Sequence, residues 1–150
     1  MNALRTSPTL WAGEWSLDQL SALTAGTLVD NLGIRFVDIA ENALIAEMVV
    51  SERTSQRMGC LHGGASLAMA ETVGSLASQM AVDRQHFAAI GLDINANHVR
   101  PVAKGEMVRA IAKPLHVGRQ THVWEVRLES SGKLICIARL TTSIQPRRKN

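Results

Sequence analysis

Residues 63–82 limit the possible folds of this chain more than any other segment. They form its longest apolar stretch, rich in Ala, Leu and Met, and Glu71 is the only charged residue among them. The stretch approaches the roughly 20 residues that a membrane span needs. It also holds a glutamine, a threonine and three serines, which together with a carboxylate would be costly at the centre of a bilayer. We therefore predict a helix over residues 65–82 that is buried inside a protein.

Six shorter segments have the composition of β-strands. Each carries β-branched residues, and turn residues such as Pro101, Gly118 and Gly132 separate the later ones. Residues 124–129 alternate between apolar and charged side chains, so one face of this strand is buried and the other faces water. The predicted strands cover residues 34–39, 43–50, 88–100, 106–116, 121–129 and 134–144.

One long apolar helix beside about six mostly antiparallel strands predicts an α+β fold in which a sheet covers the helix. The helix is apolar on nearly all faces, so one curved sheet can wrap it while a second copy of the chain covers what remains. This pattern resembles the hotdog architecture, in which a curved antiparallel sheet surrounds one long central helix. It predicts a dimer.

The chain is expected to form a single domain over residues 1–150, because no repeat, low-complexity block or linker divides it. Ser16 can cap an amphipathic helix, and a second helical turn can run over residues 27–31. Residues 1–32 are therefore predicted as a helical flank, and residues 145–150 as a basic tail.

Composition restricts the partners and the compartment. The chain has 16 Lys and Arg against 13 Asp and Glu, and three basic residues of the tail account for the net charge of +3. With no Tyr, two Phe and three Trp, it lacks the aromatic side chains on which nucleic acids stack. We expect no nucleic acid or membrane partner. Cys60 and Cys136 could form only one disulfide, and residues 1–9 lack an apolar secretion signal, which predicts a cytoplasmic protein.

Glu71 is the first candidate for chemistry, because a glutamate in a buried helix is usually paired or functional. The alternative is that its face of the helix is simply wet. One turn further along, Gly74 and Ser75 would leave room and a hydroxyl beside the carboxylate.

The entrance of the predicted helix is the second candidate. Residues 61–64 read Leu-His-Gly-Gly, and free backbone N–H groups at a helix start attract developing negative charge. Such a start can polarise a thioester carbonyl, although two glycines could also merely let the chain turn. Gly63 and Glu71 are eight residues apart, about 12 Å along a helix. One carbonyl cannot readily touch both, so a shared site would take them from two subunits of a dimer.

Residues 56–75, QRMGCLHGGASLAMAETVGS, resemble the hotdog thioesterases of the 4-hydroxybenzoyl-CoA and PaaI types. The later segments LDINANHVRP and KPLHVGRQTHVWEV resemble more closely the bacterial 1,4-dihydroxy-2-naphthoyl-CoA thioesterases and the enterobactin-pathway proofreading thioesterases. The resemblance covers nearly the whole chain. It implies hydrolysis of an acyl-CoA, with an aromatic acyl group, to free acid and CoA, with no cofactor and no metal. An acyl-carrier-protein thioester is the other substrate it allows.

The resemblance also implies roles for five residues. Glu71 is the catalytic carboxylate, acting as general base or as nucleophile, and the amide of Gly63 polarises the thioester carbonyl. His62 and Gln56 help to bind that end of the substrate, and Ser75 orients the attacking water. A homodimer with shared sites is implied, with dimers pairing into a tetramer.

The coenzyme A arm is expected along two further segments. Arg100, Arg119 and Lys104 could pair with its phosphates, or could be solvated strand ends. Arg57 and Met58 depart from the Pro and Phe of the similar enzymes, which leaves the acyl group open. The residues implied for CoA binding are Gly91, His98, Val99, Arg100, Pro101, His116, Val117, Gly118, Arg119, Gln120 and Thr121.

Other interpretations of the same residues are possible. Cys60, two residues before His62, could be a thiol nucleophile, although an unpaired cysteine is more often a small buried apolar residue. A zinc site could use His62, His98, His116 or His122, but no compact ligand pair occurs. A hotdog protein could also bind acyl-CoA without cleaving it, or act as a hydratase.

Overall fold

The long apolar segment forms helix α3 (Gly63–Met80) in the computed structural model, which describes residues 9–147. The helix begins two residues before the predicted start, because His62 is its N-cap and the ring Nδ1 accepts the N–H of Gly64 at 2.8 Å. Both glycines of the entrance are therefore helical. No helix within residues 9–147 is long and apolar enough to cross a membrane.

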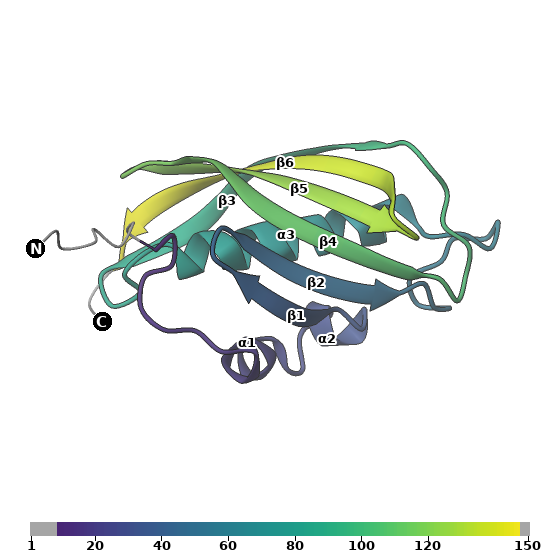
Figure 1. The fold of residues 1–150 in the computed structure, drawn as a ribbon, viewed down its shortest axis with the longest axis horizontal. Coiled ribbons are helices and arrows are strands. Elements are labelled where there is room, and N and C mark those ends of the chain that lie inside the picture. Colours follow the sequence, from purple (N-terminus) through teal and green to yellow (C-terminus); the bar gives the residue numbers. More distant parts are fainter. Residues whose placement is uncertain (1–8, 148–150) are drawn as a thin grey trace, which may run out of the picture.

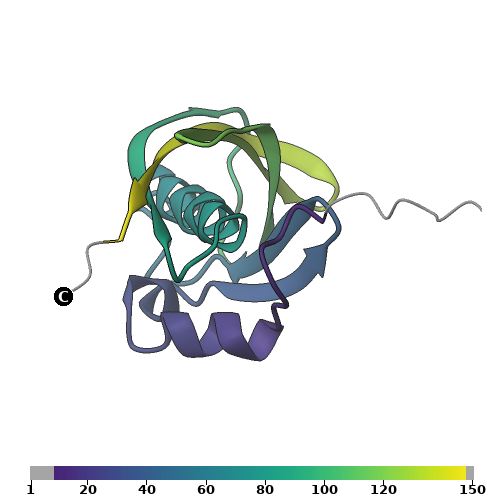
Figure 2. The same ribbon diagram turned by 90° about the vertical axis from the view of Figure 1, so that its left-hand side faces the viewer.

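A single antiparallel sheet of six strands, in the order β1-β2-β4-β5-β6-β3, curls around α3 (Figure 1). Viewed end-on, the helix lies inside the curve of the sheet (Figure 2). The predicted α+β architecture, a curved antiparallel sheet around one long helix, is confirmed. The strands are β1 (Arg35–Ala40), β2 (Ala43–Val49), β3 (Phe87–His98), β4 (Met107–Val117), β5 (Thr121–Ser130) and β6 (Lys133–Pro146).

The core lies between α3 and the concave face of the sheet. Alternate residues of β5 point inward, and Trp124, Val126 and Leu128 are fully buried. Each such side chain contributes about 1.5–3 kcal/mol when it leaves water. The helix approaches the sheet most closely at Gly74, where a Cβ would lie 2.7 Å from Cδ2 of Leu140 and 3.3 Å from Cγ2 of Val126.

The two edges of the sheet differ. At one edge, α1 (Leu17–Thr24) packs on β1, and α2 (Leu28–Asn31) follows it (Figure 2). Ser16 caps α1 as predicted, because its hydroxyl accepts the N–H of Gln19. At the other edge, β3 exposes Ile90 and Leu92, which are 52% and 62% accessible.

The last strand continues beyond its predicted end at residue 144. Gln145 pairs with Ala88 and Pro146 with Phe87, so these two residues extend β6 into the segment that was predicted as a basic tail. Pro146 is tolerated because it is the terminal residue of the strand. Residues 148–150 of that tail lie outside the described residues.

The close approach at Gly74 leads to a stability prediction. Alanine normally favours a helix over glycine by up to about 1 kcal/mol, but forcing a methyl group into a packed core costs about 1–3 kcal/mol. Gly74→Ala should therefore lower the free energy of unfolding by about 1 kcal/mol, measured by urea denaturation. Adding Leu140→Val, which shortens the contacted side chain, should make the alanine less costly. An unchanged or higher midpoint for Gly74→Ala would contradict the close packing of Gly74 against Leu140.

Candidate functional site

The start of α3 borders a cavity of about 380 Å³. Four consecutive residues predicted for CoA binding, His98, Val99, Arg100 and Pro101, line it together with Gly63. A larger cavity of about 610 Å³, near β1 and the end of β2, contains none of the predicted residues. We therefore place the candidate site at the smaller one.

Gly63 has room for a ligand only because it lacks a side chain. A Cβ there would lie 3.2 Å from Nε2 of His98, so the histidine ring covers the first turn of the helix. The N–H of Gly64 is satisfied by His62, whereas no acceptor among residues 9–147 reaches the N–H of Gly63. This free donor lies at the positive end of the helix dipole, where it can polarise a carbonyl oxygen.

Gln56 is held by its own turn and does not line the cavity. Its Nε2 donates to Sγ of Cys60 at 3.0 Å, and its Oε1 accepts the N–H of Met58 at 3.1 Å. Cys60 is therefore engaged with Gln56, while Nδ1 of His62 is occupied by the helix cap. These contacts do not form the thiol and imidazole pair of a cysteine nucleophile.

Glu71 lies half-buried in the middle of α3, beside β3. The hydroxyl of Ser75 donates to its Oε1 at 3.0 Å. The same oxygen lies 2.8 Å from the position that a Cβ on Gly91 would occupy, so the missing side chain at 91 makes room for the carboxylate. The expectation that Gly74 leaves this room was wrong, because Gly74 faces Leu140 in the core.

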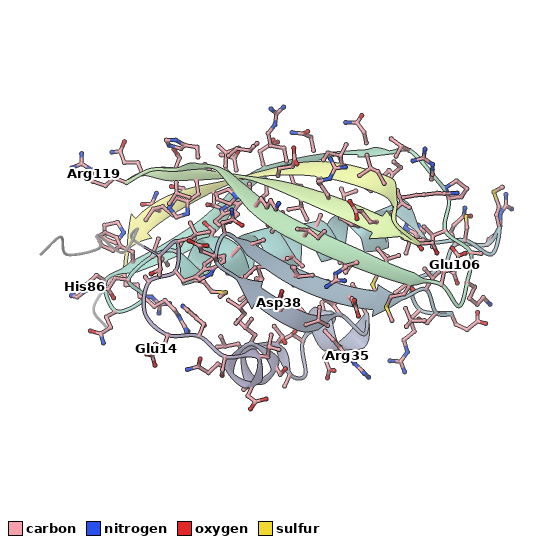
Figure 3. The ribbon with its side chains drawn as sticks, in the orientation of Figure 1. Glu14, Arg35, Asp38, His86, Glu106 and Arg119 are labelled. Atoms are coloured by element: carbon pink, nitrogen blue, oxygen red, sulfur yellow. The ribbon has the colours of Figure 1, made fainter. Side chains whose placement is uncertain are left out.

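The remaining residues predicted for CoA binding, 116–121, span the turn between β4 and β5. The N–H of Gly118 donates to the carbonyl of Thr121 at 3.0 Å, and Arg119 is exposed at the tip. Arg119 and Glu106 lie at opposite ends of the molecule (Figure 3). The N–H of Leu61, two residues before α3, donates to the carbonyl of Val102 at 2.8 Å. Glu106 follows Val102 by four residues, so it lies near the helix start. Strand β4, about 33 Å long, separates the turn from that end.

Within one chain, the predicted residues therefore lie in two separate groups, which we call the helix-start set and the carboxylate set. The helix-start set surrounds the cavity and holds Gly63 and residues 98–101. The carboxylate set holds Glu71, Ser75 and Gly91, and the turn at 116–121 lies toward the same end of the molecule.

Two of the three candidate phosphate partners are already engaged. Nη1 of Arg100 donates to the carbonyl of Leu134 at 2.6 Å, and Lys104 forms an ion pair with Glu52. Both contacts are exposed and can give way at little cost. Arg119 remains accessible at its turn.

A buried polar network that was not predicted from the sequence lies beside these residues. Oγ of Ser78 lies 2.8 Å from Nδ1 of His122 and 2.7 Å from Oγ1 of Thr142. Burial lowers the pKa of His122; a hydrogen bond to the backbone of Gly118 opposes this shift, and the nearby His116 adds to it. The alternation along β5 could have predicted that His122 is buried, because His122 lies on the same face of this strand as Trp124. It was considered only as a metal ligand, and no group of three or more His, Cys, Asp or Glu side chains within residues 9–147 could hold a metal ion.

Comparison with known proteins identifies relatives over most of the chain. The sequence profile of the Thioesterase superfamily matches residues 58–137. The 1,4-dihydroxy-2-naphthoyl-CoA hydrolase of Escherichia coli is 42% identical over 90% of this chain and 98% of its own, and the proofreading thioesterase EntH of Cronobacter turicensis is 40% identical with the same coverage. The crystal structure of a mutant of the Pseudomonas aeruginosa thioesterase PA1618 superposes with a TM-score of 0.89 at 45% identity, covering 92% of this chain and 99% of that one.

The lowered pKa of His122 leads to a prediction about stability and pH. Its ordinary pKa is 6.5. As the pH falls through this value, the unfolded chain binds a proton that the folded chain does not bind, so the free energy of unfolding decreases. His122→Gln keeps hydrogen-bonding groups but cannot titrate, and it should lose less stability than the wild type between about pH 7.5 and about pH 5. Urea denaturation at both pH values measures this. Equal losses in the two proteins would mean that His122 takes up its proton as readily when folded.

Proposed function

This chain belongs to the thioesterase superfamily and is a thioesterase of the hotdog fold, and from this premise we propose that it hydrolyses an acyl-CoA whose acyl group is aromatic. The observation that carries the proposal is the carboxylate of Glu71, half-buried, bonded to Ser75 and fitted against Gly91. The aromatic acyl group is supported by the relative whose name contains 1,4-dihydroxy-2-naphthoyl-CoA. An acyl-carrier-protein thioester is the alternative substrate.

The proposed active site is shared between two subunits. Strand β3 is a 12-residue edge strand with exposed apolar side chains, and such an edge favours pairing with another strand. Two copies of β3 that pair antiparallel about a centre halfway between Gly91 and His98 place Gly91 opposite His98 of the partner subunit. Within each chain Glu71 lies against Gly91, and Gly63 against His98. Glu71 therefore faces Gly63 of the partner subunit in this dimer.

The same register brings the two ends of the CoA site together. Within one chain, Thr121 of β5 pairs with Ser143 of β6, and Ser143 pairs with Ile90 of β3. In the proposed dimer, Ile90 faces Val99 of the partner subunit. Three strand spacings, about 14 Å, then separate the turn that carries Arg119 from residues 98–101 of the partner subunit. One CoA can contact both. We place the protein in the cytoplasm, which fits its free thiols, and expect dimers to pair into tetramers.

Hydrolysis proceeds at the thioester carbonyl carbon. The free N–H of Gly63 polarises the carbonyl oxygen, with His62 capping that helix start and Gln56 nearby. Glu71 then either takes a proton from a water held by Ser75, or attacks the carbon itself to form a mixed anhydride that water hydrolyses. In both routes the C–S bond breaks and CoA leaves as the thiol. No metal or cofactor takes part in the proposed mechanism.

Two substitutions test the position and the role of the carboxylate. Glu71→Gln keeps the size but removes the base, so kcat should fall by roughly two to four orders of magnitude with little change in KM. Gly91→Ala adds a methyl group 2.8 Å from Oε1, which displaces the carboxylate and should lower kcat about 10-fold to 100-fold without unfolding the protein. Thiol release from benzoyl-CoA, measured with Ellman's reagent in the presence of EDTA, gives both rates. Full activity of Glu71→Gln would refute the proposed role.

Mixed dimers test the shared site. Glu71→Gln subunits lack the carboxylate, and Gly63→Pro subunits lack the N–H at a helix position that tolerates proline. A heterodimer of the two has one site with both groups intact, so it should recover about half of the wild-type activity although each parent is inactive. A confirmed heterodimer without activity would show that each subunit builds its site alone.

A further inference from the structure

The side chain of Gln79 ties helix α3 to the edge strand β3. Its Nε2 donates to the carbonyl of Ala89 at 2.6 Å, and within residues 9–147 this is the one side-chain hydrogen bond that joins the helix to this strand. The proposed hydrolysis gives Gln79 no part, and neither residue lines the cavity at the helix start. The position of the bond along both elements nevertheless connects it to Glu71.

Gln79 continues the row of polar side chains that begins at Glu71. Glu71, Ser75 and Gln79 follow one another at four-residue spacing, so they lie along one side of α3. On the strand, Ala89 precedes Gly91 by two residues, so both face the same side of the sheet. The row therefore meets β3 at two points, where the carboxylate lies against Gly91 and the amide binds Ala89.

The place of β3 beside the helix matters because Glu71 is fitted closely to this strand. Oε1 of Glu71 lies 2.8 Å from the position that a Cβ on Gly91 would occupy, so a small movement of the strand changes what surrounds the carboxylate. Within residues 9–147, β3 pairs only with β6, and the register of that pairing shifts between Gly91 and Asp93. The ladder is locally disrupted at such a shift. The bond to Ala89 therefore holds the strand next to the point where its own pairing is interrupted.

The second polar atom of Gln79 indicates that stability alone does not explain a glutamine at this position. Its Oε1 is buried, and no donor within residues 9–147 reaches it. A buried acceptor without a partner costs at least as much free energy as one hydrogen bond supplies, so an apolar side chain of similar length would serve the core as well. An apolar side chain could not hold the carbonyl of Ala89.

We propose that Gln79 is a positioning residue for the catalytic carboxylate: by binding the carbonyl of Ala89 it holds β3 against α3, so that Gly91 keeps Glu71 in place. This inference rests on the proposed function, because it takes Glu71 as the catalytic group. Gln79 itself touches no reacting atom. Its loss should slow the chemical step and leave substrate binding unchanged.

Gln79→Met tests this role, because methionine keeps the length of the side chain and loses the donor. With benzoyl-CoA, kcat should fall about 10-fold to 100-fold, the scale expected for a displaced catalytic group, while KM stays within about twofold. The midpoint of urea denaturation should change little, because the unpartnered Oε1 is lost together with the bond. Gln79→Lys, which can still donate to the carbonyl of Ala89, should recover most of kcat.

A double-mutant cycle shows whether Gln79 acts through the carboxylate. In the Glu71→Gln background there is no catalytic carboxylate to position, so adding Gln79→Met should lower kcat no further. Equal fold-losses in the two backgrounds would show that Gln79 supports the fold as a whole, and they would overturn the proposal. A folded Gln79→Met variant with the kcat of the wild type would overturn it as well.

Ser130 supplies a matched control away from Glu71. Ser130 is buried and its hydroxyl donates to the carbonyl of Met107 at 2.8 Å, so Ser130→Ala also removes one bond from a side chain to a main-chain carbonyl. This variant should lose stability while kcat stays within about twofold. A loss of kcat as large as that of Gln79→Met would overturn the proposal, because any lost buried bond would then slow the reaction. If Gln79→Met does not fold, Gln79→Asn takes its place, because asparagine has the same amide but is too short to reach Ala89.

Crystal structures of the wild type and of Gln79→Met provide a readout that needs no turnover. If the wild type does not hydrolyse benzoyl-CoA or other aromatic acyl-CoA thioesters, the proposed function fails. The positioning role of Gln79 then stands if Oε1 of Glu71 has moved away from Gly91 in the variant. It falls if the carboxylate and β3 keep their places.

Discussion

The burial of α3 inside the curved sheet is the constraint on which the rest of the structure depends. Gly74 lets the helix approach Leu140 closely, and a helix held on that side has a limited surface left for polar groups. Glu71, Ser75 and Ser78 use one stripe of it, at spacings of four and three residues. The helical period therefore puts the carboxylate, its hydroxyl partner and the buried polar network on one side of α3.

Strand β3 connects this packing to the proposed chemistry. Its inner side makes room for Glu71 at Gly91, and its outer edge exposes Ile90 and Leu92. The register of β3 with β6 shifts between Gly91 and Asp93, so a bulge lies next to the carboxylate. Bulges redirect side chains beside functional sites. A strand shaped in this way both positions the carboxylate and leaves an edge that a second copy of the chain can cover.

Much of the fold could be predicted from the sequence, because periodicity depends only on which side chains are apolar. The long helix, six strands and the cap at Ser16 were predicted to within a few residues. The room beside Glu71 was assigned to Gly74 instead of Gly91, because sequence spacing shows neighbours on one helix but not contacts with a strand. Gln56 was assigned to the substrate, and its engagement with Cys60 depends on the local turn, which has no sequence pattern of its own.

The buried network shows why a polar layer can persist inside such a core. Along β6 the inward residues run from Leu140 through Thr142 to Ile144, and Ile144 belongs to a second, smaller apolar cluster. Thr142 thus lies between two apolar layers, with Ser78 and His122 as partners. A shift of β6 by two residues would keep its alternation but would separate the hydroxyl from these partners, and a buried polar group without a partner costs about 1–3 kcal/mol. The polar layer therefore selects one register where apolar packing alone would tolerate several, and that register also aligns Thr142 with Gly91 beside the carboxylate of Glu71.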